Sequence, residues 1–244
     1  VLKPGTIAPL ICFHAAGGNV FNYRSLIPYV DSAQPIIGLQ SAPSEGDIPK
    51  YKSIEEMASN YIEEIKKVQP DGPYTLSGGS MGGMLALEAA LQLIKSGQAV
   101  DKLILFDTFG PEIDLLMYKP EKIKMTMSLL FKGLKNKSSY LRKSFILRIY
   151  SMLNIKLPLD VLIHANSINN FNALLNYKPT IYPFDIYLIR VKRSEQGIYS
   201  DPFMGWKSFV NGSIYIHEIN ATHEKFVESK EFESAFKKIL RLNN

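Results

Sequence analysis

A glycine-rich segment in the first half of the chain restricts the possible fold more than any other feature. Residues 76–83 read LSGGSMGG and contain the pentapeptide G-x-S-x-G around Ser80. The apolar run PYTL leads into this segment, and apolar residues at helical spacing follow it as far as Lys95. A serine between a buried strand and a helix is typical of a nucleophile elbow, with the helix N-terminus behind it. The sequence therefore predicts a strand, a sharp turn bearing Ser80, and a helix.

A serine in this setting requires an acid and then a histidine later in the chain. Asp107 ends the apolar strand pattern KLILFD, and the ends of parallel strands open onto the face where ligands bind. The chain has four histidines, of which His217 lies inside an alternating strand pattern. His223 follows that strand by a short loop. We therefore expect Asp107 to orient His223, which would act as the base for Ser80.

Two later carboxylates are alternatives to Asp107, because many α/β-hydrolases carry the acid one strand further along. Glu195 and Asp201 follow the apolar strand pattern at 186–191. Both lie in a polar stretch with glycine and proline, which is typical of a solvated loop. Asp107 is preferred because it ends a strand directly.

Backbone N–H groups that would stabilise an oxyanion are expected at two places. One is Met81, directly after the serine. The other is the segment HAAGGN at 14–19, which follows the strand pattern at 9–13. Small side chains there allow the backbone to approach a substrate carbonyl, so we assign the N–H of Ala16 together with that of Met81. His14 is expected to brace this loop.

Strand and helix patterns alternate along the rest of the chain. Residues 35–39 predict a strand, and the sequence SIEE at 53–56 is a capping box that opens a helix. The apolar stripe of this helix comprises Met57, Tyr61, Ile65 and Val68. A last amphipathic helix is expected near the C-terminus. Such alternation predicts an α/β domain with a mostly parallel sheet flanked by helices.

Several segments in the first half of the chain, together with two shorter stretches near its end, carry a family resemblance. These segments are FHAAGGNVFNY at 13–23, QPIIGLQ at 34–40, SIEEMA at 53–58, VQPDGPY at 68–74, GGSMGGMLALE at 78–88 and LFDT at 105–108, with DPFMGW at 201–206 and the surroundings of His223. In this order they resemble the thioesterase domain that ends nonribosomal peptide synthetases and related polyketide synthases. The resemblance runs through roughly residues 8–110. It implies an α/β-hydrolase fold with a helical lid insertion.

By position, the resemblance places the family's nucleophile on Ser80, its acid on Asp107 and its base on His223, with oxyanion donors on Ala16 and Met81. It implies that the serine takes an acyl or peptidyl chain from the phosphopantetheine thiol of a carrier protein. Hydrolysis or macrocyclisation then releases the chain. The resemblance implies no bound cofactor, and it implies a carrier domain as partner, upstream in the same polypeptide.

Two positions depart from the family pattern. Gly79 stands where the family usually has a larger, often aromatic residue, and the loop before the histidine reads NATH at 220–223 instead of Gly-Asp/Asn-His. A stand-alone editing thioesterase and a general carboxylesterase remain alternative functions with the same triad. A catalytically silent hydrolase-fold module used for docking is an alternative of another class.

The alternation of strand and helix patterns is interrupted at residues 111–182. This stretch between two strand patterns is long, whereas a hydrolase core needs only one crossover helix there. We expect a single domain over residues 1–244, with a core at 1–110 and 183–244 and a helical lid insertion between them. A rigid helical layer without gating is the alternative. Candidate substrate-binding residues are Phe109, Met117, Met125, Phe171 and Trp206, the last of which could instead belong to the core.

Positive charge is concentrated in the same insertion. The chain has a formal net charge of +5, and the insertion carries lysines and arginines from Lys119 to Lys156 with Glu121 as nearly their only acidic neighbour. We expect this face to dock an acidic carrier protein, and a solvated helix face is the alternative. No recognised nucleic-acid-binding fold accompanies the charge, so nucleic acid is not an expected partner.

Other features of the sequence limit the possible functions and locations of the chain. No stretch of eighteen uninterrupted apolar residues occurs, so no membrane span is expected. No cluster of metal-ligating residues stands out, and a metal site is not expected. Cys12 is the single cysteine, which excludes a disulfide within the chain and makes a reducing cytoplasm the expected location. The chain starts at Val1 rather than at a methionine, which suggests a fragment of a larger polypeptide.

Overall fold

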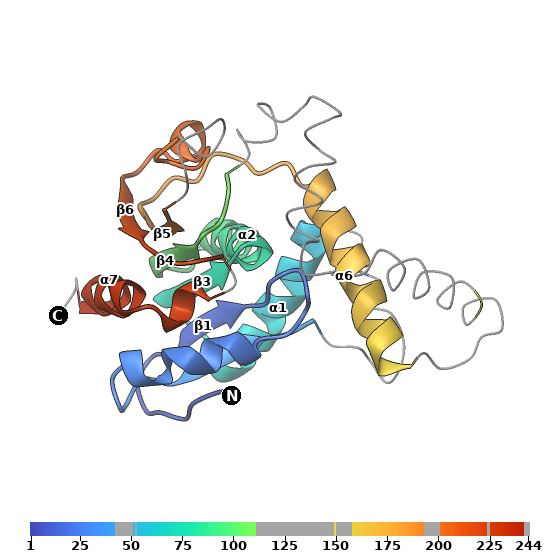
Figure 1. The fold of residues 1–244 in the computed structure, drawn as a ribbon, viewed down its shortest axis with the longest axis horizontal. Coiled ribbons are helices and arrows are strands. Elements are labelled where there is room, and N and C mark those ends of the chain that lie inside the picture. Colours follow the sequence, from blue (N-terminus) through green and yellow to red (C-terminus); the bar gives the residue numbers. More distant parts are fainter. Residues whose placement is uncertain are drawn as a thin grey trace.

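Within the described residues, a sheet of six parallel strands forms the centre of the molecule (Figure 1). The structure is a computed structural model, and it describes residues 1–41, 51, 53–110, 149, 158–192, 201–223 and 225–241. The strands lie in the order β2-β1-β3-β4-β5-β6. Their bounds are β1 Leu10–Phe13, β2 Ile36–Leu39, β3 Tyr74–Gly79, β4 Val100–Phe106, β5 Ile186–Val191 and β6 Ile214–Ile219.

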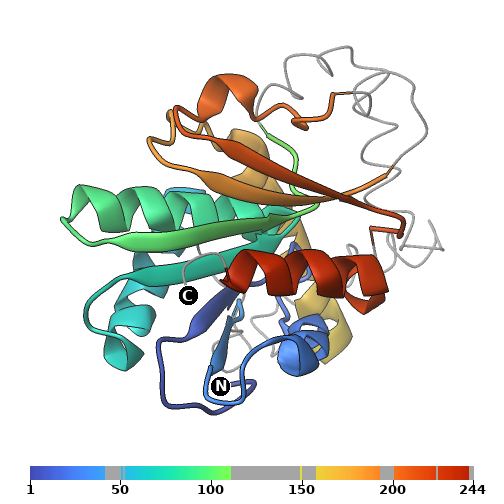
Figure 2. The same ribbon diagram turned by 90° about the vertical axis from the view of Figure 1, so that its left-hand side faces the viewer.

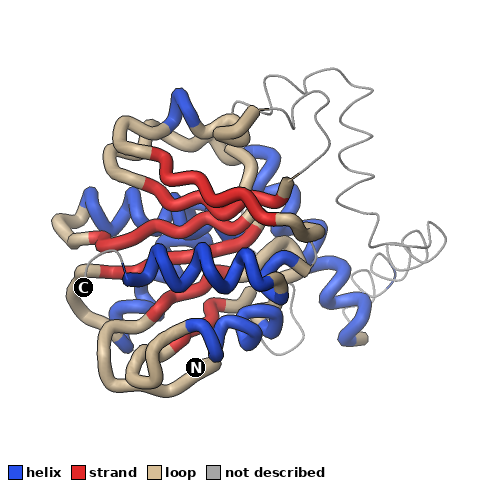
Figure 3. Tube along the Cα trace, turned by 60° about the vertical axis from the view of Figure 1, so that its left-hand side comes forward, coloured by secondary structure: helices blue, strands red, loops and turns tan. Residues whose placement is uncertain are grey.

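Helices cover both faces of this sheet, as Figures 2 and 3 show from two further directions. Helices α1 and α2 lie on one face, and η1 and α7 lie on the other. The helix bounds are η1 Phe21–Tyr29, α1 Ile54–Val68, α2 Met81–Lys95, α6 Leu159–Asn176, η3 Lys207–Phe209, η4 Phe226–Glu228 and α7 Lys230–Arg241. The predicted α/β class with a mostly parallel sheet is therefore confirmed.

The capping box predicted from the sequence opens α1. The Ser53 side chain accepts a hydrogen bond from the Glu56 N–H at 3.2 Å, which satisfies one of the free donors at the helix start. Met57, Tyr61 and Ile65 are buried, as the apolar stripe predicts. The stripe prediction is wrong for Val68, which is 58% exposed at the last residue of α1.

Helix α6 is the described helix of the predicted insertion; it lies at one side of the molecule (Figure 1), where it contacts α2. Residues 111–148 and 150–157 lie outside the described residues. The basic residues from Lys119 to Lys156 lie there as well, so the lid and its charged face remain predictions. None of the described helices is both long enough and apolar enough to cross a bilayer.

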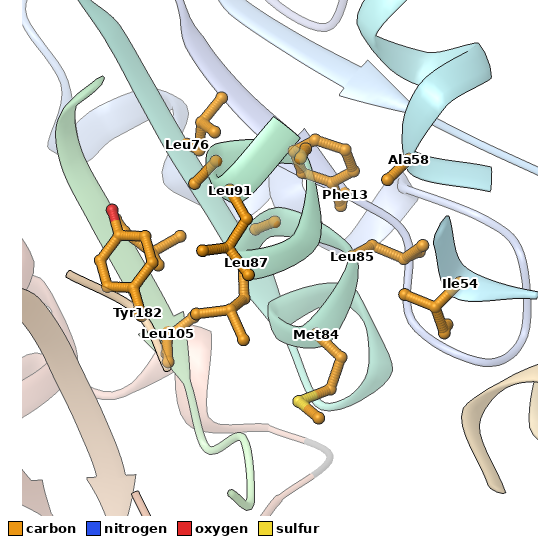
Figure 4. Packing of buried hydrophobic residues seen from close by; sticks show 14 of the residues in the cluster. Phe13, Ile54, Ala58, Leu76, Met84, Leu85, Leu87, Leu91, Leu105 and Tyr182 are labelled. Carbon is orange, nitrogen blue, oxygen red and sulfur yellow. The ribbon is translucent and has the colours of Figure 1, made fainter. Parts of the chain in front are cut away.

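The hydrophobic core lies in two layers, one on each face of the sheet. In the layer shown in Figure 4, Leu87 of α2 packs towards Leu105 of β4, while Leu85 faces Ile54 and Ala58 of α1. All five of these side chains are fully buried. The central strands β1, β3 and β4 are apolar along most of their length because both of their faces are covered.

The contact between β3 and α2 is closest at two glycines. A Cβ atom built on Gly78 would lie 2.1 Å from the carbonyl oxygen of Gly82, far inside van der Waals contact. Any larger residue at position 78 would push the start of α2 away from the end of β3. The turn that carries Ser80 therefore depends on the absence of a side chain at Gly78.

We predict that Gly78→Ala lowers the free energy of unfolding by at least about 3 kcal/mol, because the added methyl group meets backbone atoms that cannot move independently. Urea unfolding followed by circular dichroism measures the change. Gly17→Ala is the matched control, since its Cβ would meet nothing closer than 3.7 Å. This control should stay within about 0.5 kcal/mol of the parent protein. Equal stability of the two variants would contradict the prediction.

Candidate active site

Ser80 lies on the turn between β3 and α2 in a backbone conformation that non-glycine residues rarely adopt, with φ at 54° and ψ at −123°. Strand β4 holds this conformation in place. The Ser80 N–H donates to the carbonyl oxygen of Phe106 at 3.0 Å, and the Thr108 hydroxyl lies 3.2 Å from the Ser80 carbonyl oxygen. The backbone of the serine is thus bonded to the two residues that flank Asp107.

A buried tyrosine connects the same turn to β1. The Gly79 N–H donates to the Tyr23 hydroxyl oxygen at 2.9 Å, and this hydroxyl donates to the carbonyl oxygen of Phe13 at 2.7 Å. Tyr23 is fully buried, and burial raises the pKa of its phenol, so the hydroxyl keeps its proton. Tyr23 therefore fixes the distance between the serine turn and the loop that follows β1. Nothing in the local sequence pattern signals this role.

Asp107 follows β4 and is fully buried. Its Oδ2 atom lies 2.5 Å from Nδ1 of His223, and its Oδ1 atom accepts a hydrogen bond from the Val191 N–H at 3.0 Å. Its own N–H donates to the carbonyl oxygen of Ile189 at 2.7 Å. Strand β5 thus orients the carboxylate through its backbone. The His223 side chain is 36% exposed, so the ring is held by Asp107 at one edge and reaches solvent elsewhere.

The alternative acid Asp201 is engaged in a turn. Its Oδ1 accepts from the Phe203 N–H at 3.0 Å and its Oδ2 accepts from the Gly205 N–H at 2.6 Å. Both carboxylate oxygens therefore stabilise the turn at 201–205. The other alternative, Glu195, lies outside the described residues.

The two predicted oxyanion donors lie at the same edge of the sheet. Ala16 is half-buried in the loop after β1, and Met81 is the first residue of α2. Among the described residues, no hydrogen bond uses either of these backbone N–H groups. Gly82 also brings this loop close to α2, since a Cβ there would lie 2.3 Å from the Phe13 carbonyl oxygen.

His14 holds the loop after β1 against α1. Its Nδ1 lies 2.7 Å from the Ala15 carbonyl oxygen and its Nε2 lies 2.7 Å from the Tyr61 hydroxyl. A carbonyl can only accept, so Nδ1 carries the proton and the Tyr61 hydroxyl donates to Nε2. Burial lowers the pKa of His14 to about 4, so the ring is neutral at pH 7.

The candidate substrate-binding residues fall into three groups. Phe109 is partly buried, and Phe171 lies buried on α6. Trp206 is fully buried, and its indole N–H donates to the Thr108 carbonyl oxygen at 2.8 Å. Trp206 is therefore better described as a residue that supports the loop after Asp107 than as one that contacts a substrate. Met117 and Met125 lie outside the described residues.

The position of these groups defines a class of protein. Within the described residues, no group of three or more His, Cys, Asp or Glu side chains could hold a metal ion. Instead, a serine follows β3 on a strained turn, a buried carboxylate follows β4, and a histidine bonded to it follows β6. A parallel sheet with this order of groups at the carboxyl ends of its strands is an α/β-hydrolase.

Sequence comparison gives the family. The sequence model of the thioesterase domain matches residues 8–143, more than half of the chain, and the chain belongs to this family. Malpinin synthetase of Mortierella alpina is 30% identical over 233 residues, which cover 94% of this chain and 3% of the synthetase. A dimodular nonribosomal peptide synthase of Bacillus subtilis strain 168 is 28% identical over 231 residues, which cover 90% of this chain and 10% of the synthase. The chain therefore spans at most a tenth of these relatives.

Solved structures agree with this assignment. The chain resembles the four-domain nonribosomal peptide synthetase holo-AB3403, with a TM-score of 0.76 and 25% identity over 99% of this chain and 20% of that one. It also shares its fold with the thioesterase domain SrfTE, described for the cyclisation of surfactin. That match has a TM-score of 0.62 and 16% identity over 98% of this chain and 92% of SrfTE. The resemblance predicted from the sequence is confirmed.

We predict that Asp107→Asn lowers kcat for a small thioester by about 10³–10⁴-fold, because an amide at this position favours the wrong tautomer of His223. The amide oxygen can still accept from the Val191 N–H, so the variant should remain folded. Steady-state kinetics and circular dichroism measure the two effects. Asp101→Asn on the same strand is the control and should stay within about two-fold of the parent protein. Full activity of Asp107→Asn would exclude Asp107 as the acid.

We also predict a loss of stability in acid that originates at His14. The unfolded chain binds a proton at His14 below its ordinary pKa of 6.5, whereas the folded chain does so only near pH 4. The free energy of unfolding should therefore fall by up to about 3 kcal/mol between pH 6.5 and pH 4. Urea unfolding at several pH values should show a flatter profile for His14→Gln. His217→Gln is the control with a smaller expected effect, since His217 is only half-buried. Parallel profiles for His14→Gln and the parent protein would contradict the prediction.

Proposed function

We propose that this chain is the chain-releasing thioesterase domain of a larger synthetase. It takes an acyl or peptidyl chain from a carrier-protein phosphopantetheine thioester onto Ser80 and releases that chain by hydrolysis or macrocyclisation. The observation that carries the proposal is the hydrogen bond between Asp107 and His223 beside the strained turn of Ser80. Membership of the thioesterase domain family supports the same chemistry.

The first step forms an acyl-enzyme. Asp107 accepts from Nδ1–H of His223, which leaves Nε2 free to remove the proton of the Ser80 hydroxyl. The serine oxygen attacks the thioester carbonyl, and the N–H groups of Ala16 and Met81 stabilise the negative oxygen of the tetrahedral intermediate. The carbon–sulfur bond then breaks, the sulfur takes the proton from Nε2 of His223, and the carrier's thiol leaves.

The second step releases the chain. His223 removes a proton from water or from a hydroxyl or amine of the bound chain, and the activated group attacks the ester on Ser80. The ester bond breaks and the proton returns to the serine oxygen. Water gives a free acid, and an internal nucleophile gives a lactone or lactam. Exclusion of water from the site favours cyclisation.

The proposed partner is an acyl or peptidyl carrier domain, upstream in the same polypeptide and in the cytoplasm. Two findings support a carrier domain in the same polypeptide: this chain matches only a small part of the length of its relatives, and the solved synthetase holo-AB3403 has four domains. We propose further that residues 111–182 form a lid over the acyl chain in a single domain. The position of α6 against the loop after β1 supports this arrangement.

The test is intact mass after mixing the protein with an acyl thioester of a pantetheine mimic. We expect a mass increase equal to the acyl group, because deacylation is slower than acylation when the site excludes water. The increase should be absent in Ser80→Ala and strongly reduced in His223→Ala.

Comparison of carrier-bound chains with simple esters separates the proposal from a general carboxylesterase and from a docking module. Faster turnover of carrier-bound chains than of simple esters supports the release of carrier-bound chains. Efficient cleavage of simple esters with no turnover of carrier-bound thioesters would indicate a general carboxylesterase. No adduct and no turnover with any substrate would indicate a docking module without catalysis.

A further inference from the structure

Three asparagines on one face of α6 connect this helix to the core. They occupy positions 166, 169 and 170, a spacing that places them side by side on a helix. Each makes a hydrogen bond to a different segment: the Ser41 hydroxyl donates to Oδ1 of Asn166 at 3.1 Å, Nδ2 of Asn169 donates to the Tyr51 carbonyl at 3.1 Å, and Nδ2 of Asn170 donates to the Ala16 carbonyl at 3.0 Å. Of the three, Asn170 bonds directly to a residue that we assign to the oxyanion hole.

Hydrogen bonds from His14, Gly18 and Asn170 hold two successive peptide groups of the loop after β1. The Ala15 carbonyl accepts from His14 Nδ1–H at 2.7 Å and from the Gly18 N–H at 2.9 Å. Because a trans peptide is planar, fixing this carbonyl also fixes the direction of the Ala16 N–H on its opposite side. The next carbonyl, that of Ala16, is held by Asn170. Thus His14 orients the peptide group that carries the proposed donor, and Asn170 orients the one that follows it.

The surroundings of Asn170 indicate a role beyond stability. Asn170 is fully buried, and its Oδ1 atom has no hydrogen-bond partner within the described part of the chain. A buried polar atom without a partner destabilises the folded state. An apolar side chain would avoid this cost. The feature that requires an asparagine is the hydrogen bond to Ala16, across 154 residues of sequence.

We propose that Asn170 is a positioning residue: it holds the carbonyl side of Ala16 while His14 holds the peptide group on the N–H side, so that the Ala16 N–H stays directed at the oxyanion formed at Ser80. This inference rests on the proposed function, because it assumes that Ser80 is acylated. It makes the rate of acyl transfer depend on α6, a helix of the insertion between β4 and β5. Asn170 itself touches no reacting atom.

Helix α6 has anchors that do not involve Asn170. At its C-terminal end, the Tyr177 hydroxyl donates to Oε2 of Glu88 on α2 at 2.7 Å. The bonds of Asn166 and Asn169 hold the middle of the helix to other segments. Removal of the Asn170 side chain should therefore leave α6 in place and release only the loop.

The experiment measures how fast a fluorophosphonate labels Ser80, because the phosphoryl oxygen occupies the position of the oxyanion. We compare Asn170→Ala and Asn170→Leu with two controls. Asn169→Ala loses the bond from α6 to the Tyr51 carbonyl but none to Ala16, and Asn172→Ala changes an exposed residue of the same helix. Both Asn170 variants should label about 10-fold or more slowly, since loss of one complete oxyanion donor costs about 10²–10³-fold. The two controls should stay within about two-fold of the parent protein.

Three further readouts separate positioning from a general structural role. With a small pantetheine thioester, the Asn170 variants should lose kcat at unchanged KM. The pH dependence of kcat should keep its shape, because Asp107 and His223 are intact. Asn170→Leu should unfold at the same or a higher urea concentration than the parent protein.

Labelling of Asn170→Ala and Asn170→Leu at the parental rate would overturn the inference. An equal loss in Asn169→Ala, or a loss in both Asn170 variants that follows a lower unfolding midpoint, would also overturn it. Failure of the parent protein to be labelled at Ser80 would instead contradict the proposed function. The two failures can thus be told apart.

Discussion

Ser80 holds a backbone conformation that the rest of the fold has to maintain. A non-glycine residue with φ at 54° persists only where its surroundings enforce it. Bonds to Phe106 and Thr108 hold Ser80 from β4, and the Tyr23 hydroxyl holds Gly79 from the side of β1. The missing side chain at Gly78 lets α2 begin directly after the turn. One strained residue thus fixes the relative places of three strands and the helix N-terminus.

The buried carboxylate of Asp107 is stabilised by the same edge of the sheet. Removing a charge from water is costly unless hydrogen bonds replace the water. Here Val191 N–H satisfies one oxygen and His223 satisfies the other. The arrangement explains how an acid that follows β4 can reach a histidine that follows β6.

Local patterns predicted the six strands and the helices α1, α2 and α7, and they singled out Ser80, Asp107 and His223. The G-x-S-x-G turn, the capping box at Ser53 and the strand ending at Asp107 each occupy a few consecutive positions. Tyr23 and Asn170 could not be found in this way, because their partners lie 56 and 154 residues away. A lone tyrosine or asparagine carries no periodic signal, and only the folded chain shows which backbone group it meets.

The order of elements along the chain has an evolutionary consequence. Ser80, Ala16 and Asp107 all precede the long segment that separates β4 from β5. They follow β3, β1 and β4, and hydrogen bonds join these three strands at the edge of the sheet where the residues lie. If that segment forms the proposed lid, mutation or recombination within it can reshape the space around an acyl chain without disturbing those bonds. Contacts such as the one between Asn170 and Ala16 limit this freedom to variants that keep a matching donor. Selectivity and reactivity can therefore diversify at different speeds in the same domain.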